Sequence, residues 1–119
     1  MDNEKQILNT VLYMVCTYYQ IEPNDVKGKD RARYLVTARQ IYCHLARTYT
    51  RSTFKRIGSI INRDHATVIY SDNQAKILST IEDKTAYDLR SIIQLNPEIK
   101  MLFQTGNANA IHRMRSVAD

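Results

Sequence analysis

The sequence has few of the residues that interrupt regular structure. Its 119 residues include three glycines, two prolines and no tryptophan. No run of apolar residues approaches the roughly eighteen that a membrane span needs. The start, Met1 to Glu4, has neither the basic residues nor the apolar segment of a signal peptide. With so few breakers and no long alternation of period two, we expect a soluble, cytoplasmic, all-helical chain with no membrane association.

Cysteine is scarce as well. Cys16 and Cys43 each lie among helix-forming residues, and neither has a second Cys or a His at metal-ligand spacing. This pattern favours two buried, reduced thiols, although the sequence alone leaves a disulfide open. We predict no metal site and no cofactor.

Signals of catalysis are also missing. No segment matches the phosphate-binding pattern G-x-x-x-x-G-K-[ST], and three glycines are too few for an ATPase module. His65 has no Cys, Ser or carboxylate cluster at a spacing that would make it a catalytic base or a metal ligand. His44 fits a packed or half-exposed histidine, and His112 belongs to the tail. We expect a protein that is not an enzyme and binds no nucleotide.

Positive charge is concentrated in the middle third of the chain. The net charge is +5 overall, yet residues 27–63 contain ten basic side chains against the single acid Asp30, a net +9 that leaves −4 for the rest. Those ten are Lys27, Lys29, Arg31, Arg33, Arg39, Arg47, Arg51, Lys55, Arg56 and Arg63. A charge confined in this way favours one face that binds a polyanion.

Apolar residues recur at helical spacing along most of the chain. Pro23 should end the first helix, and Thr37 should cap the second. Between them lies a basic loop from Lys27 to Arg33. The expected helices cover about residues 4–19, 37–49 and 53–61, a further one begins after Asp64, and residues 81–95 either continue that helix or form a separate one.

The end of the chain differs in composition from the rest. Asn96 and Pro97 should stop the last long helix, and only a weak apolar cluster follows before a polar tail that we expect to be mobile. We therefore predict a helical domain over residues 1–96 and a C-terminal extension over 97–119. Four tyrosines fall on or beside apolar stripes, and most of them are expected in the core with their hydroxyls at its edge: Tyr18, Tyr42, Tyr49 and Tyr87.

Residues 53–69 have the outline of a helix-turn-helix. Two short helices are joined by a few residues, and Asp64 is placed to cap the second. The second helix begins with polar or small residues, and its apolar positions start only at Val68. Such a helix start can be held out of the core, and its free N–H groups favour a nearby phosphate. By itself, the outline is shared by many helical hairpins.

The amino-acid sequence of this segment is more specific than its helix-turn-helix outline. Ile57-Gly58-Ser59-Ile60-Ile61-Asn62-Arg63-Asp64-His65-Ala66-Thr67-Val68-Ile69 resembles the signature of the C-terminal DNA-binding domain of the bacterial replication initiator DnaA. Upstream, Arg31-Ala32-Arg33 and the Thr37-Ala38-Arg39-Gln40-Ile41 stretch resemble the family's basic loop and Arg-Gln-rich helix. The resemblance covers roughly Ile7 to Leu95. It implies a compact all-α bundle with a Trp-repressor-like helix-turn-helix that binds double-stranded DNA.

The resemblance also implies roles for individual residues. The arginine of the basic loop enters the minor groove, the start of the recognition helix reads bases in the major groove, and the remaining positions contact phosphates or base edges. Carried over position by position, the DNA-binding residues are Arg31, Arg33, Arg39, Gln40, Lys55, Arg56, Arg63, Asp64, His65, Ala66 and Thr67.

Three departures from the family pattern bear on function. Ala66 stands where the family usually has a hydroxylated residue, so one hydrogen bond is lost and we expect the preferred DNA site to shift. The turn Ile61-Asn62-Arg63 lacks the common glycine pair and should be tighter. No ATPase module is present, so we expect a stand-alone, nucleoid-associated DNA-binding piece that reads sites of the replication-origin type.

The sequence leaves two further functions open. The protein could regulate replication or repress transcription through DNA, and a phage or mobile element could carry it. Alternatively, the fold could serve as a protein-interaction module that presents its basic face or its C-terminal extension to a partner. The sequence has no exposed heptad seam that would predict a dimer.

Overall fold

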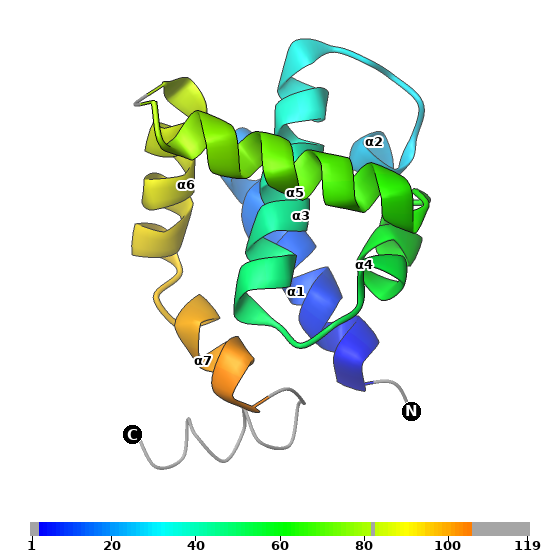
Figure 1. Cartoon of the computed structure of the whole chain (residues 1–119), viewed down its shortest axis with the longest axis vertical. Coiled ribbons are helices and arrows are strands. Elements are labelled where there is room, and N and C mark those ends of the chain that lie inside the picture. Colours follow the sequence, from blue (N-terminus) through cyan, green and yellow to red (C-terminus); the bar gives the residue numbers. More distant parts are fainter. Residues whose placement is uncertain (1–2, 82, 106–119) are drawn as a thin grey trace.

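The computed structural model describes residues 3–81 and 83–105, with side chains to residue 102, and within these ranges every regular element is a helix (Figure 1). The all-α prediction is therefore confirmed. The helices are α1 (Asn3–Tyr19), α2 (Pro23–Lys27), α3 (Arg33–Tyr49), α4 (Phe54–Ile60), α5 (His65–Ser79), α6 (Lys84–Leu95) and α7 (Ile99–Thr105).

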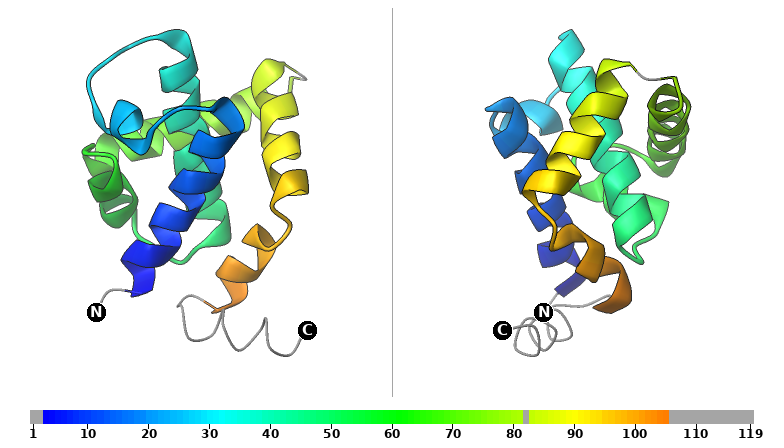
Figure 2. Two further views of the ribbon diagram at one scale, coloured as in Figure 1. Left: turned by 180° about the vertical axis from the view of Figure 1, so that it is seen from behind. Right: turned by 90° about the vertical axis from the view of Figure 1, so that its left-hand side faces the viewer.

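Helix α3 is the centre of the bundle. It lies between α1 and α5, so that three helices form successive layers (Figure 2). Its apolar stripe, with Leu35, Ile41 and Leu45, is buried against both neighbours. Tyr42 is fully buried, and its hydroxyl donates to the Ile57 carbonyl of α4 at 2.9 Å. This bond satisfies a polar atom that burial would otherwise make costly, and it attaches α4 to the central helix.

The two cysteines are buried free thiols, as the sequence predicted. Burial raises the pKa of the Cys16 thiol to about 11 and that of the Cys43 thiol to about 12. Both are therefore protonated at neutral pH and act as small core side chains.

The start of the chain follows the prediction up to Tyr19 and then departs from it. The backbone leaves α1 through Gln20, whose φ is 58°. Pro23 does more than end α1, because it is the first residue of the short helix α2, where its missing N–H costs nothing. The Glu22 amide donates to the Asp25 carboxylate at 3.2 Å and secures this start.

The second long helix begins earlier than expected. Thr37 was predicted to be its cap, but α3 starts at Arg33, four residues upstream. The Ala32 amide donates to the Asp30 carboxylate at 2.9 Å, and this turn directs the chain into the helix. Because α3 starts earlier than predicted, the basic loop is shorter and Arg33 lies in the first turn of α3.

The second half of the chain resolves the alternative left open by the sequence. Helices α5 and α6 are separate, and the Asp83 carboxylate caps α6 by accepting from the Ala86 amide at 3.2 Å. The core extends past Asn96, because Ile99 and Leu102 of α7 are buried. Of the predicted extension over 97–119, residues 106–119, which include His112, lie outside the described residues.

The tyrosines divide differently from the prediction. Tyr42 is in the core and Tyr18 and Tyr49 are partly buried, but Tyr87 is 62% exposed and is the exception among the four. No helix in the described part of the chain is both long and apolar enough to cross a membrane.

One buried carboxylate joins α1 to α6. Asp88 is inaccessible to solvent and accepts hydrogen bonds from the hydroxyls of Tyr18 (2.8 Å) and Tyr19 (2.6 Å). The ammonium of Lys84 approaches the same carboxylate at 2.9 Å. Burial alone would raise the pKa of Asp88, but the three donors outweigh it and hold that pKa below its usual value.

This cluster predicts a pH dependence of stability. Because the pKa of Asp88 is lower in the folded protein than the value of about 3.9 in an unfolded chain, its contribution is complete above about pH 5 and is lost as the pH falls through the folded pKa. We expect Asp88→Asn to lower the free energy of unfolding by about 1–3 kcal/mol at neutral pH. Urea unfolding at several pH values should show the difference in unfolding free energy between the wild type and Asp88→Asn becoming smaller below about pH 4. A gap that stays constant down to pH 3 would contradict the role given to the carboxylate.

Candidate nucleic-acid interface

Helices α4 and α5 form the helix-turn-helix, and each has a side-chain cap. The Thr53 hydroxyl accepts from the Arg56 amide at 3.2 Å at the start of α4. The Asp64 carboxylate accepts from the Thr67 amide at 2.8 Å at the start of α5. The same amide holds the pKa of Asp64 below its usual value, so this cap is ionised at neutral pH. The predicted cap at Asp64 is confirmed.

The turn between these helices achieves its sharp bend without glycine. Asn62 has a φ of 59°, in the left-handed region that asparagine tolerates better than other non-glycine residues. Its side-chain amide also reaches the Lys27 carbonyl, at 3.4 Å. Asn62 therefore supplies the left-handed conformation that the turn requires.

Gly58 sets the close approach of α4 to the turn. Its carbonyl accepts from the Arg63 amide at 2.9 Å. A Cβ at this position would lie 2.3 Å from the Arg63 carbonyl oxygen and 2.9 Å from a methyl carbon of Val68. Only glycine fits at this contact, which holds the start of α5 against α4.

The first turn of α5 faces solvent, as the sequence predicted. His65, Ala66 and Thr67 are exposed, and the first buried residue of the helix is Val68. The polar start is therefore held out of the core by a buried anchor one turn later. Such a start can enter a DNA groove without unfolding any part of the bundle.

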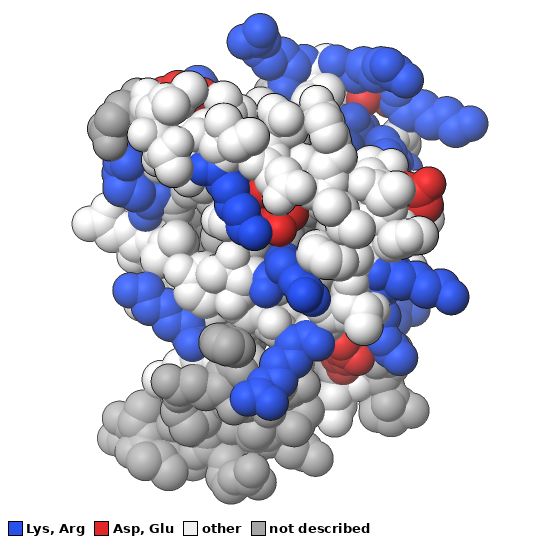
Figure 3. Space-filling view, in the orientation of Figure 1, with Lys and Arg blue, Asp and Glu red and all other residues white. Residues whose placement is uncertain are grey.

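The basic loop between α2 and α3 lies beside this helix start. Lys29 and Arg31 are exposed in the loop, and Arg33 is exposed in the first turn of α3. In Figure 3 the Lys and Arg side chains gather over this loop, whereas the front of α5 is mostly uncharged. Farther along, Arg31, Arg33 and Gln40 line a hollow that reaches the end of α5.

Two predicted DNA-binding arginines have other partners. Arg39 is 8% exposed, and its guanidinium donates to backbone carbonyls of the segment 25–30. Arg63 is half-buried and donates to the Gly28 carbonyl at 2.7 Å. The assignment of Arg39 to the DNA surface needs correction, because a guanidinium enclosed by four carbonyls is not presented to a phosphate.

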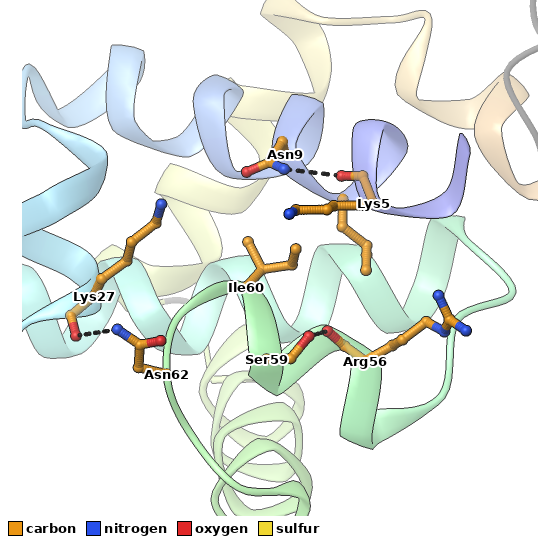
Figure 4. A pocket seen from close by; sticks show the side chains of 8 residues that line it. Lys5, Asn9, Lys27, Arg56, Ser59, Ile60 and Asn62 are labelled. Carbon is orange, nitrogen blue, oxygen red and sulfur yellow. Dashed lines mark hydrogen bonds between the residues drawn. The ribbon is translucent and has the colours of Figure 1, made fainter. Parts of the chain in front are cut away.

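The two cations of α4 are differently placed. Lys55 is exposed, whereas Arg56 forms an ion pair with Glu4 of α1 at 3.2 Å. Arg56 also lines a basic cleft between α1 and α4 (Figure 4). The residues that line this cleft are Lys5, Leu8, Asn9, Lys27, Arg56, Ser59, Ile60 and Asn62.

Sequence reasoning missed the contribution of α1 to this cleft. Lys5 and Asn9 are one helical turn apart and both exposed, which is a signal that the polar face of α1 could have given. It also missed Asp72, which is buried between His44 (2.9 Å) and Lys76 (3.3 Å) at the contact of α3 with α5. No local pattern marks an aspartate as buried at this point of a helix.

The described residues contain no group of three or more His, Cys, Asp or Glu side chains that could hold a metal ion. What the structure does bring together is the exposed start of α5, the basic loop and the outer side of α4. The hydrogen bond from Arg63 to the Gly28 carbonyl, between residues 35 positions apart in the sequence, connects the helix-turn-helix to the basic loop.

Comparison with known sequences identifies relatives of this region. The family described as bacterial dnaA protein helix-turn-helix matches residues 8–75. The chain is 41% identical over 86 residues to the chromosomal replication initiator protein DnaA of Chlorobaculum tepidum, an alignment covering 71% of this chain and 16% of that protein. It is 36% identical over 85 residues to the chromosomal replication initiator protein DnaA 2 of Chlamydia pneumoniae, covering 71% and 18%.

A third relative extends the match slightly. The DnaA protein of Lacticaseibacillus casei is 34% identical over 93 residues, covering 75% of this chain and 20% of the relative. In each case the matched region is a fifth or less of the relative's length.

The contact at Gly58 gives a prediction about stability. Gly58→Ala should lower the free energy of unfolding by about 1–3 kcal/mol or more, because the new methyl group must displace the backbone of the turn. Gly28→Ala is the matched control, since its Cβ would meet the nearest atoms at 3.5 and 3.6 Å and its φ is −82°. The control should change stability by less than about 1 kcal/mol in urea unfolding. Equal effects of the two substitutions would contradict the close approach.

Proposed function

The chain belongs to the bacterial DnaA helix-turn-helix family, and from this premise we propose that it is a sequence-specific binder of double-stranded DNA. The start of α5 enters the major groove, and Arg31 of the basic loop enters the adjacent minor groove. The observation that carries the proposal is the exposed, capped first turn of α5 beside a cationic loop. A recognition helix requires this combination of solvent exposure and rigidity.

Each exposed side chain has chemistry that fits its place. Arginine suits a narrow, electronegative minor groove. His65 and Thr67 can donate to base edges or phosphates, and the methyl group of Ala66 can contact a thymine methyl. Lys55 on the outer side of α4 is placed for the sugar-phosphate backbone, which contributes affinity without reading sequence.

The family relationship supports sites of the DnaA-box type. The relatives named above are chromosomal replication initiators. We propose that this chain acts at the nucleoid, in replication initiation or its regulation, by marking an origin, competing for boxes or repressing nearby transcription. Ala66 then shifts the preferred sequence at one position without removing the capacity to bind.

A protein-interaction function is the second candidate. Tyr70 and Ile77 are seven residues apart on α5 and 61% and 56% exposed, so they place apolar surface on one side of the helix. This surface lies beyond the first turn of α5. A partner bound there could coexist with DNA.

Fluorescence anisotropy at near-physiological salt tests the proposed function. The full chain is titrated with a duplex that carries a DnaA-family box and with a shuffled version of it. A preference for the box supports the proposal. Equal and steeply salt-dependent affinities would contradict sequence-specific reading, and absence of binding to both duplexes would leave the interaction function as the better account.

Single substitutions should separate base reading from backbone contact. We expect Arg31→Ala and His65→Ala each to weaken box binding by about 5- to 100-fold, corresponding to about 1–3 kcal/mol. Lys55→Ala should weaken binding to both duplexes alike and lower the salt slope by about one. Lys100→Ala is the charge-matched control, because Lys100 is exposed on α7, at the far end of the bundle from the basic loop (Figure 1). A loss of binding in the control as large as in Arg31→Ala would contradict the interface.

A further inference from the structure

Arg39 holds the basic loop from the inside of the fold. Its Nε donates to the Val26 carbonyl at 2.8 Å, and its Nη1 donates to the Asp30 carbonyl at 2.7 Å. Its Nη2 donates to the carbonyls of Asp25 (3.2 Å) and Gly28 (3.1 Å). One planar guanidinium thus fixes four carbonyls, two in α2 and two in the loop. Lysine, with donors on one nitrogen, cannot span them.

Arg63 holds the same segment from the helix-turn-helix. Its Nη2 donates to the Gly28 carbonyl at 2.7 Å, and its Nη1 donates to the Ile61 carbonyl of its own turn at 3.0 Å. Asn62 adds a contact to the Lys27 carbonyl at 3.4 Å, which Figure 4 shows at the edge of the basic cleft. The Gly28 carbonyl is therefore shared by two arginines that come from different elements.

Two guanidinium groups at one carbonyl repel each other. Burial and the nearby charge of Arg63 both lower the pKa of Arg39. The end of α2 and the loop add positive charge at Lys27, Lys29 and Arg31, which Asp30 offsets in part. In isolation such a segment would fluctuate, because its backbone has no regular partner. The hydrogen bonds from Arg39 and Arg63 hold it in one conformation despite the repulsion between the two guanidinium groups.

We propose that Arg39 and Arg63 are positioning residues that fix Arg31 relative to the start of α5, so that the minor-groove and major-groove contacts are made at one spacing. Neither residue needs to touch a base in this role. The ordering of the loop then precedes binding, and less conformational entropy is lost when DNA arrives. This proposal rests on the proposed function, because it assumes that Arg31 enters a minor groove.

A minor-groove probe tests the proposal. Each adenine of the bound site is replaced singly by 2,6-diaminopurine, which adds an amino group in the minor groove and leaves the major-groove edge of the base unchanged. The readout is the ratio of Kd for the substituted duplex to Kd for the unsubstituted one. Because unfolded protein scales both constants equally, a loss of stability in a variant cancels from the ratio.

The wild-type ratio should reach about 5- to 100-fold at the adenines beside Arg31, in line with the discrimination of a good base contact. In Arg39→Lys and Arg63→Lys, which keep the charge but lose the guanidinium, it should fall at least about fivefold toward one. His65→Ala, which alters the major-groove contact, is the control and should keep the wild-type ratio while binding more weakly. An unchanged ratio in both arginine variants would overturn the proposal and leave them purely structural.

The same ratio distinguishes a failure of the proposed DNA-binding function from a failure of the positioning role alone. A wild-type ratio near one at every adenine would overturn the minor-groove contact, and with it the role given to the two arginines, whatever the preference for the box.

A measurement without DNA gives a second check. Trypsin should cleave after Lys29 and Arg31 at least about tenfold faster in Arg39→Lys than in the wild type, because local opening sets this rate. Equal cleavage rates, with α-helical circular dichroism retained, would overturn the proposal.

Discussion

The close approach at Gly58 is the constraint on which the interface depends. Because no side chain separates α4 from the Arg63 carbonyl, the turn is short and α5 leaves it in a fixed direction. Asn62 supplies the left-handed residue, and Val68 anchors the helix one turn later. The three exposed residues before Val68 are consequently displayed on a support that the core holds rigid. The proposed function of this helix start thus depends on the packing behind it.

The basic loop depends on the same turn. Arg63 contributes its amide to Gly58 and its guanidinium to Gly28, so one residue connects the direction of α5 with the conformation of the loop. Arg39 completes the arrangement from α3, the helix with the most extensive packing in the bundle. The two elements proposed to enter adjacent grooves are therefore parts of one rigid unit and not two independent arms.

Much of this could be predicted from the sequence, because local chemistry determines it. Apolar periodicity identified the long helices, and Asp64 identified the start of α5. The failures concern long-range contacts: Arg39 was assigned to DNA because of its charge and its family position, but burial against the carbonyls of α2 and the loop decides its role. Similarly, Ile99 and Leu102 complete a core whose demand for apolar surface a local pattern cannot show.

The most direct test of this account is an amide chemical-shift titration of the full chain with its preferred duplex. If the loop and the start of α5 read DNA as one unit, the largest shifts should fall at residues 28–33 and 63–67 and should progress together along the titration. Shifts centred on the outer side of α5 around Tyr70 and Ile77, or spread over α6 and α7, would contradict it and would favour binding through a different face.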